Sequence, residues 1–246
     1  MGPDPEPVDA VQIWRVDLEL EESRLAQFRA LLSPEEIARA DRFRFPADRR
    51  RFVASHGALR LILSTAVAVP AEHLLFTKDP GGKPRLAGRP PAGGVRFNLS
   101  HSGETALIAL SRTREVGVDL EQIRPDRATA ELARRYFSPA ESGPLTALPP
   151  GERTAAFFAC WARKEAYLKA RGDGLRFPLE RFTVSLGEPA KLLEVQGEPA
   201  ECSRWEMYSL ALGAEYAGAV VVERADREGV SILLKEYEPG LGPPRL

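Results

Sequence analysis

The chain has 246 residues, enough for one large domain or for two of roughly 100 to 150 residues each. Its 34 lysines and arginines nearly balance 35 aspartates and glutamates, so the net charge of -1 excludes a general nucleic-acid binder but allows a local basic pocket for an anion. Cys160 and Cys202 have no motif spacing, which argues against a zinc site and a disulfide framework.

Two features of the sequence bear on where the protein is located. The sequence has no apolar run of the roughly 18 residues that a membrane helix needs. It begins MGPDPEPVDA, which is acidic and proline-rich, whereas a signal peptide is basic and then apolar. We therefore expect a cytoplasmic protein with no membrane partner. We also expect residues 1–8 to be disordered and residues 237–246 to form a flexible tail.

The elements expected in the first half begin with a helix at LSPEE, residues 32–36, where Ser takes the N-cap and Pro the first helical position. A long helical pattern contains residues 51–60, and LLFTKD follows at 74–79. Strands with period-two alternation are predicted at 95–100, 105–111 and 115–121.

The second half repeats this series. FSPAE at 137–141 and the helical segment 156–165 each lie 105 positions after their counterparts, and ERFTVS at 180–185 resembles LLFTKD at nearly the same offset. Strands are again predicted at 181–186, 191–195, 204–210 and 216–223. Two similar α+β halves, residues 9–123 and 124–236, are therefore expected to pack side by side. The alternative is a chance match of short motifs.

The strand at GVDLE carries the first candidate chemistry. Side chains alternate along a strand, so Val116, Val118 and Leu120 should face the core while Gly117, Asp119 and Glu121 share the other face. Two carboxylates about 6.6 Å apart along one face can bind one hard cation. The alternative is a solvated strand face.

The neighbouring strand favours the first interpretation, because FNLSHSG ends in a turn that brings hydroxyls, an imidazole and backbone amides to the same edge. For His101 alone, a simple turn hydrogen bond would be the usual interpretation.

The helix at 155–171 adds a third carboxylate. Glu165 lies on the apolar stripe with Phe158, Trp161 and Leu168, where a carboxylate needs a partner or a metal. The alternative is a surface salt bridge to Lys169, four residues later. Oxygen ligands without cysteine suit Mg²⁺ rather than zinc. The metal set is Asp119, Glu121 and Glu165, and the residues expected to complete a phosphate pocket are Lys83, His101, Lys164 and Lys169.

Three motifs in this order and spacing resemble the signature of the 4'-phosphopantetheinyl transferase superfamily, in its large pseudo-dimeric surfactin type. They are FNLSHS, GVDLE and WARKEAYLKARGDGL. The GKP turn at 82–84 and the segment LSPEEIARADRFRF are similar as well, so the likeness runs from Val11 to Glu223. The shorter relatives, the holo-acyl-carrier-protein synthases, are trimeric and half as long, so the duplication assigns this chain to the larger type.

The resemblance implies an α+β fold, a pseudo-two-fold duplication of two similar α/β halves, each a small, mostly antiparallel sheet packed on a long helix. It implies transfer of the 4'-phosphopantetheine group of coenzyme A to a serine of an apo acyl or peptidyl carrier protein, with release of adenosine 3',5'-bisphosphate. Mg²⁺ is the implied metal, with Mn²⁺ as a substitute. The carrier can belong to fatty-acid, polyketide or nonribosomal peptide synthesis. One chain should be a monomer with one coenzyme A site.

The resemblance also assigns roles to residues. Asp119, Glu121 and Glu165 match the metal ligands, Glu165 also matches the proposed general base, and Lys169 matches the lysine at the transferring phosphate. Ser100 and His101 match contacts to the nucleotide phosphates, Gly82, Lys83 and Pro84 match the turn around the adenine, and Arg39 and Arg51 match contacts to the 3'-phosphate. Glu36 departs from the pattern, because the surfactin-type relative carries a basic residue there.

Two alternatives of other classes remain open. A Mg²⁺-dependent hydrolase of nucleotides like coenzyme A would use the same parts with water as the nucleophile. A non-catalytic module that binds coenzyme A or a carrier protein would need the phosphate pocket without intact metal ligands, and all three carboxylates are present.

Overall fold

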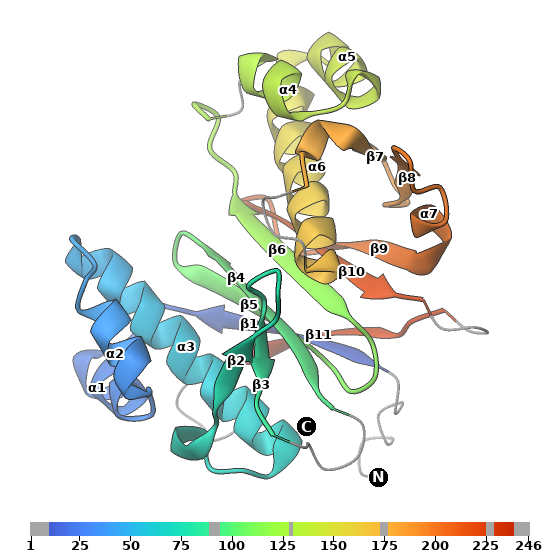
Figure 1. Ribbon diagram of the computed structural model, residues 1–246. Helices are drawn as coiled ribbons and strands as arrows, with labels where there is room; N and C mark the ends of the chain where they lie inside the picture. Colours follow the sequence, from blue (N-terminus) through green and yellow to red (C-terminus); the bar gives the residue numbers. More distant parts are fainter. Residues whose placement is uncertain (1–9, 89–93, 128–129, 173–176, 225–228, 239–246) are drawn as a thin grey trace, which may run out of the picture.

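The computed structural model describes residues 10–88, 94–127, 130–172, 177–224 and 229–238. These residues form two main sheets, each covered by one long helix, and two small hairpins (Figure 1). Among the helices described, none combines the length and apolar character that a membrane crossing requires.

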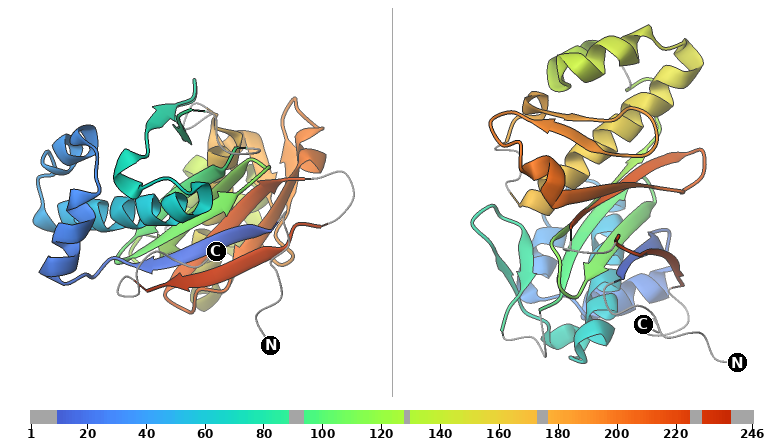
Figure 2. Two further views of the ribbon diagram at one scale, coloured as in Figure 1. Left: turned by 90° about the horizontal axis from the view of Figure 1, so that it is seen from below. Right: turned by 90° about the vertical axis from the view of Figure 1, so that its right-hand side faces the viewer.

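The first sheet has four strands in the order β11-β1-β5-β4. They are β1 (Val11–Asp17), β4 (Arg96–Ser102), β5 (Thr105–Ser111) and β11 (Ile232–Tyr237). The pairs β1/β5 and β4/β5 are antiparallel, whereas β11 runs parallel to β1. Helix α3 (Pro46–Val67) covers this sheet, because its side chains Phe52 and Ile62 share one apolar core with Trp14 and Ile108. Helices α1 (Glu22–Ala30) and α2 (Pro34–Ala40) lie beside α3 (Figure 2).

The second sheet has the antiparallel order β6-β10-β9. Its strands are β6 (Val116–Gln122), β9 (Trp205–Leu210) and β10 (Tyr216–Glu223). Helix α6 (Pro150–Arg171) packs on it, with Phe157 and Tyr167 in one core with Trp205 and Val221. The remaining elements are β2 (Phe76–Lys78), β3 (Pro84–Leu86), β7 (Phe182–Val184), β8 (Leu192–Val195), α4 (Ala130–Tyr136), α5 (Pro139–Ala147), α7 (Glu201–Arg204) and the 3₁₀ turns Ala71–His73 and Leu179–Arg181.

The duplicated α+β fold is confirmed, and side-chain contacts repeat along with the elements. The long helices α3 and α6 both have 22 residues. Both Ser-Pro segments form capping boxes, in which the glutamate side chain accepts a hydrogen bond from the backbone of the N-cap serine. Each glutamate then pairs with a cation on the long helix: Glu36 with Arg60 at 2.7 Å, and Glu141 with Lys164 at 2.6 Å.

The strands of the two halves are exchanged across the expected boundary at residue 123. Strand β6 precedes the boundary but pairs with β10, and β11 follows it but pairs with β1. A third apolar cluster, which includes Ile13 and Leu107 of the first sheet and Val118 and Val220 of the second, joins the sheets. Tyr237, expected in the tail, is the last residue of β11. The terminal segments 1–9 and 239–246, where disorder was expected, lie outside the described residues.

A seam of side-chain hydrogen bonds joins the two sheets between β4 and β6. Alternate polar side chains of β4 accept hydrogen bonds from alternate backbone amides of β6. The pairs are Asn98 Oδ1 with Val118 N (2.9 Å), Ser100 Oγ with Leu120 N (3.4 Å) and Ser102 Oγ with Gln122 N (2.9 Å). The FNLSHS motif therefore lies directly beside GVDLE, as the sequence predicted.

Candidate active site

Asp119 lies at the centre of the candidate site, on the face of β6 that α6 covers. Its Oδ1 accepts hydrogen bonds from Ser100 Oγ at 2.9 Å and from Lys169 Nζ at 2.6 Å. Lys169 also donates to Ser100 Oγ at 2.9 Å, so a strand of each sheet and α6 meet at this point. The Asp119 side chain is 5% exposed, and within the described chain its Oδ2 is buried without a hydrogen-bond partner.

The other two carboxylates share this electrostatic environment. Burial and the charges of Asp119 and Glu165 raise the pKa of Glu121 to about 7, against the opposing effects of Lys169 and a hydrogen bond from Ser102. Burial and then the charge of Asp119 raise the pKa of Glu165, while Lys169 opposes the shift. Three negative groups close enough to disfavour one another's charge are typical of a cation site.

Gly117 allows α6 to approach β6 this closely. A Cβ atom at Gly117 would lie 2.2 Å from Ala166 O and 2.2 Å from Ala170 N, both main-chain atoms of α6. Any larger residue would separate the strand from the helix that carries Glu165 and Lys169. The sequence placed Gly117 on the same face as Asp119, but its function is visible only once the partner helix is known.

Three more basic side chains, all from the first half of the chain, belong to the predicted site: His101, Arg51 and Arg39. Partial burial of the ring, with the positive charges of Lys169 and Arg51, lowers the pKa of His101. The Arg51 guanidinium bonds to Glu104 and, through Nη1, to Asp48 at 3.1 Å. Arg39 is exposed, with its guanidinium 5.1 Å from the centre of the Phe52 ring. The structure thus brings His101 close enough to Lys169, Arg51 and Arg39 for their charges to act on its ring.

Lys164 does not belong to this group, which corrects the sequence prediction. Its side chain is 0% exposed, and its ammonium bonds to both carboxylate oxygens of Glu141 and to Phe182 O. Lys164 therefore holds the inner face of α6 to α5 and β7, and has no access to a phosphate at Asp119.

The side chain of Lys83 is likewise directed away from solvent. Its side chain is 4% exposed, and its Nζ bonds to Val116 O, Ala170 O and Glu115. The expectation that its ammonium completes the phosphate pocket is therefore not met. Gly82, at φ 90°, and Pro84, the first residue of β3, form the exposed part of the same turn.

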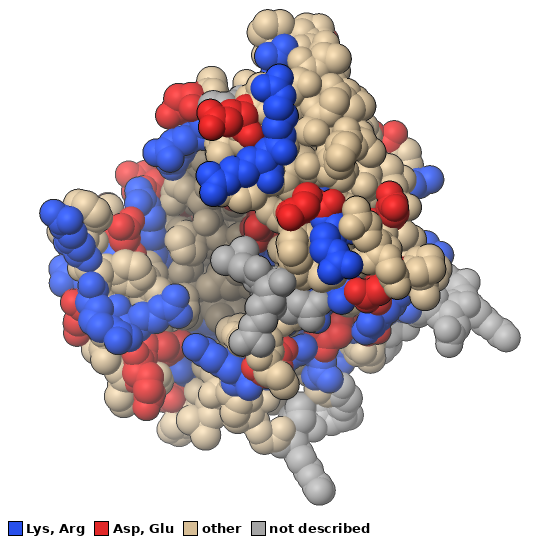
Figure 3. Space-filling model, turned by 45° about the horizontal axis from the view of Figure 1, so that its top comes forward, with Lys and Arg blue, Asp and Glu red and all other residues tan. Residues whose placement is uncertain are grey.

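A pocket of about 340 Å³ begins at Glu121, one of the three carboxylates. Ser102 and Glu121 line one end, and Phe157, Phe158 and Trp161 of α6 line an apolar wall. Arg124, Arg127, Gln122 and Leu132 complete the lining. The sequence placed Phe158 and Trp161 on an apolar stripe, and both line this pocket, Phe158 as a buried residue and Trp161 as a partly buried one. Figure 3 shows a hollow between the two halves with lysine and arginine side chains on its rim.

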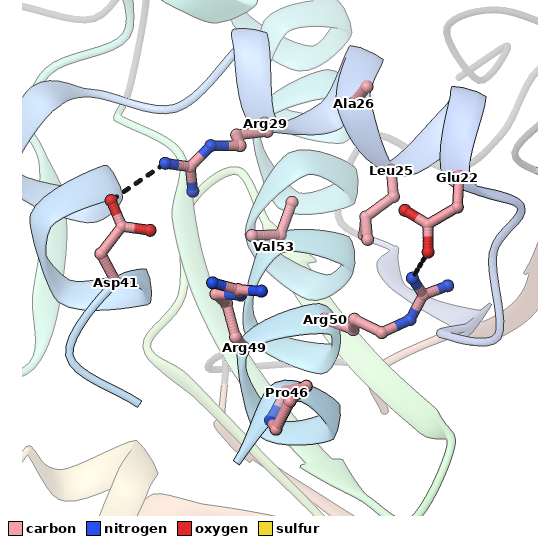
Figure 4. A pocket seen from close by; sticks show the side chains of 9 residues that line it. All are labelled: Glu22, Leu25, Ala26, Arg29, Asp41, Pro46, Arg49, Arg50 and Val53. Atoms are coloured by element: carbon pink, nitrogen blue, oxygen red, sulfur yellow. Dashed lines mark hydrogen bonds and ion pairs between the residues drawn. The ribbon is translucent and has the colours of Figure 1, made fainter. Parts of the chain in front are cut away.

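A second pocket, of about 580 Å³, lies between α1 and α3, and none of the predicted site residues lines it (Figure 4). Two of its arginines are neutralised, Arg29 by Asp41 and Arg50 by Glu22. The size of a pocket is thus a poor guide here, and the titratable cluster identifies the site.

The carboxylates fit a magnesium ion rather than a closed metal cage. Within the described residues, no three His, Cys, Asp or Glu side chains converge tightly enough to surround a metal. Mg²⁺ typically takes one or two carboxylates and fills its other positions with water and substrate phosphates. The buried, unpartnered Asp119 Oδ2 is the type of oxygen that such an ion binds.

Comparison with known families gives two matches that together span most of the chain. The family model described as 4'-phosphopantetheinyl transferase superfamily matches residues 115–221. The model described as 4'-phosphopantetheinyl transferase, N-terminal, matches residues 19–113. The boundary between the two matches falls immediately before β6.

Curated relatives with the same description match this chain over most of their length. The chain is 43% identical to the 4'-phosphopantetheinyl transferase HetI of Nostoc sp. over 216 residues, 87% of this chain and 88% of that protein. It is 34% identical to the 4'-phosphopantetheinyl transferase psf-1 of Bacillus pumilus, over 92% of this chain and 94% of that protein. It is 29% identical to the 4'-phosphopantetheinyl transferase Sfp of Bacillus subtilis, over 76% of this chain and 81% of that protein. A solved Chronobacterium ammoniagenes ACPS-CoA complex aligns with 47% of this chain and 99% of its own, at 21% identity and a TM-score of 0.34.

Proposed function

This chain belongs to the 4'-phosphopantetheinyl transferase superfamily and is an enzyme that transfers phosphopantetheine to carrier proteins, and from this premise we propose the donor, the metal and the residue roles. Coenzyme A is the donor, and a serine hydroxyl of an apo acyl or peptidyl carrier protein is the acceptor. The serine oxygen attacks the phosphorus that bears the pantetheine arm, and the pyrophosphate bond to the nucleotide breaks. The products are the holo carrier protein and adenosine 3',5'-bisphosphate.

The observation that carries this proposal is the meeting of Asp119, Ser100 and Lys169 at hydrogen-bond distances. Asp119, Glu121 and Glu165 would hold Mg²⁺, one or two of them directly and the rest through water, with Mn²⁺ as a substitute. When bound, the metal neutralises charge on the pyrophosphate and on the departing nucleotide phosphate. Lys169, with a side chain 29% exposed, faces the transferring phosphate, and its charge favours the same transition state.

Glu165 is the general base for the carrier serine. A base works best when its pKa approaches the working pH, and burial beside Asp119 raises the pKa of Glu165 in that direction. The proton of the serine hydroxyl moves to a Glu165 carboxylate oxygen, directly or through a water, as the new O–P bond forms.

The neighbouring groups bind the other parts of coenzyme A. His101, Arg51 and Arg39 bind the nucleotide phosphates, and the exposed backbone of the turn at Gly82 and Pro84 borders the adenine. The apolar wall of Phe157, Phe158 and Trp161 suits the pantetheine arm, because this wall lies in the pocket that Glu121 also lines.

We place this enzyme in the cytoplasm as a monomer with one coenzyme A site. The halves 9–123 and 124–236 are similar, but the first carries Arg60 at the position that corresponds to Glu165 in the second. Arg60 is buried and pairs with Glu36, so the first half lacks the base. Calorimetry should give one coenzyme A per chain, and a finding of two equivalent sites would contradict the assignment.

Product analysis separates transfer from hydrolysis. With coenzyme A, Mg²⁺ and an apo carrier protein, adenosine 3',5'-bisphosphate should appear in equal amount to modified carrier, and EDTA should stop both. Release of the nucleotide without a carrier would identify a hydrolase. Binding of coenzyme A without either product would identify a non-catalytic module.

A further inference from the structure

Strand β6 and helix α6, which carry all the proposed metal ligands, touch main chain to main chain at one point. A Cβ atom at Gly117 would lie 2.2 Å from Ala166 O and Ala170 N, whereas ordinary contacts begin at 3.4 Å. Residues 166 and 170 each directly follow one of the functional side chains of α6, and Gly117 lies two residues before Asp119. Contact at this point therefore determines how far the functional side chains of the helix stand from those of the strand.

Lys83 joins the same two elements from outside. Its Nζ donates to Val116 O on β6 at 2.8 Å and to Ala170 O on α6 at 3.2 Å, and its third contact is Glu115 at 3.1 Å. A lysine ammonium has three donors, so each has a protein acceptor. Val116, which carries the first carbonyl, precedes Gly117 in the strand. Ala170, which carries the second, is one of the helix residues that Gly117 contacts.

The turn that carries Lys83 is itself fixed against the end of α6. A Cβ atom at Gly81 would lie 1.6 Å from Gly172 O, so the turn touches the helix C-cap directly. Asp79 Oδ1 accepts from Lys83 N at 2.9 Å. Arg85 donates to both carboxylate oxygens of Glu115 at 2.7 Å, which holds the acceptor of Lys83 in place. A hairpin of the first half is thus attached to a helix of the second.

We propose that Lys83 and Gly117 are positioning residues that together set the distance of α6 from β6, and with it the spacing of the proposed metal ligands. Gly117 sets the closest approach, and Lys83 holds the two elements at that approach. Neither residue needs to touch the substrate for this function. The inference rests on the proposed metal site.

The test uses Gly117→Ala and Lys83→Met in the full chain, with Mn²⁺ as the probe. In Gly117→Ala the distance from the new Cβ to the helix backbone must increase from 2.2 Å to at least 3.4 Å, so strand and helix must move apart by about 1.2 Å. Lys83→Met keeps the length of the side chain and removes all three donors. Free Mn²⁺ is counted by electron paramagnetic resonance, with saturating coenzyme A and no carrier protein, so that no turnover occurs.

Both variants should weaken Mn²⁺ binding by about tenfold or more, the usual effect of removing a group that orients metal ligands. The value of kcat should fall, while the KM for coenzyme A at saturating Mg²⁺ stays within a factor of about three, because Asp79 and the contact with Gly172 still hold the backbone of the turn that borders the adenine. Arg60→Met is the matched control, since Arg60 also joins a glutamate to two backbone carbonyls, in the first half and away from the site. Its Mn²⁺ affinity should equal that of the wild type.

Gly117→Ala presses on main-chain atoms, and Lys83→Met removes three donors, so either variant can fail to fold. In that case Lys83→Gln, which keeps an amide donor, takes its place in the test. Wild-type Mn²⁺ affinity in any folded Lys83 or Gly117 variant would overturn the positioning function and leave the proposed enzyme intact. Absence of Mn²⁺ binding in the wild type would instead overturn the metal site itself, and this inference with it.

Discussion

Lys169 donates to Asp119 across the boundary between α6 and β6, with 2.6 Å between Nζ and Oδ1. Its carboxylate partner among the described ion pairs is thus Asp119, and not Glu165 four residues earlier on the same helix. The simple surface pair that the sequence left open is not formed. The helix instead directs its cation into the site.

Lys169→Met should therefore reduce catalysis rather than stability. Loss of one charged donor aimed at developing charge typically lowers kcat by about 10²-fold or more, so we expect a loss of that size. Steady-state kinetics with coenzyme A and an apo carrier protein measure it. Lys191→Met is the control, because Lys191 is exposed and lies directly before β8, outside the candidate site. An unchanged kcat in Lys169→Met would remove this residue from the mechanism.

Glu165→Gln should lower kcat by about 10²-fold, which corresponds to roughly 2.7 kcal/mol of transition-state stabilisation. The variant keeps the size of the side chain and removes one metal charge and the base. Since burial disfavours the charged form of Glu165, its melting temperature should not fall. Glu152→Gln, an exposed substitution in the first turn of the same helix, is the matched control. Wild-type turnover in Glu165→Gln would show that Glu165 is neither a metal ligand nor the general base.

Lys164→Met should show the opposite pattern. Breaking a buried ion pair leaves the Glu141 charge uncompensated, which typically costs about 3 to 5 kcal/mol of unfolding free energy. Chemical denaturation measures the loss, and the folded fraction should keep its kcat. A variant of normal stability with a large increase in the KM for coenzyme A would restore Lys164 to the phosphate pocket.

His56 should make the fold sensitive to acid. Burial and the charge of Arg39 lower its pKa to about 3, against 6.5 in an unfolded chain. Between these values the unfolded chain binds a proton that the folded protein does not, so stability falls as the pH falls below 6.5. For this residue the loss is about 2 kcal/mol between pH 7 and pH 5.

The measurement for His56 is the unfolding free energy of wild type and His56→Phe at both pH values. The phenylalanine keeps a ring stacked on Phe52, which lies 3.8 Å away between ring centroids. The wild type should lose more stability than the variant on acidification. Equal losses would show that His56 titrates alike in both states.

Local pattern was sufficient for several elements of the fold and for the position of Asp119 on β6. Period-two alternation correctly placed Val118 in the core and Asp119 opposite it, and the Ser-Pro signals correctly began α2 and α5. Strands β1 and β11 were not predicted, and the exchange of β6 and β11 between halves was also missed. Partner choice in a sheet depends on contacts distant in sequence, which alternation does not encode.

The two lysine errors have different physical origins. Successive helix residues point about 100° apart, so Lys164 and Glu165 do not share a face, and this was readable from the sequence. The burial of Lys83 was not, because a lysine in a turn is normally exposed and its acceptors lie on two other elements. Gly117 shows the same limit, since a glycine reveals a close approach only when its partner is known.

The intact mass of an apo carrier protein tests the central claim most directly. After incubation with coenzyme A, Mg²⁺ and wild-type enzyme, the carrier mass should increase by one phosphopantetheine group. The increase should disappear with EDTA and fall by about 10²-fold or more in rate with Asp119→Asn, which keeps the shape but removes the central negative charge. Modification by Asp119→Asn at the wild-type rate, or full modification in EDTA, would contradict a metal-dependent site built on Asp119, Glu121 and Glu165.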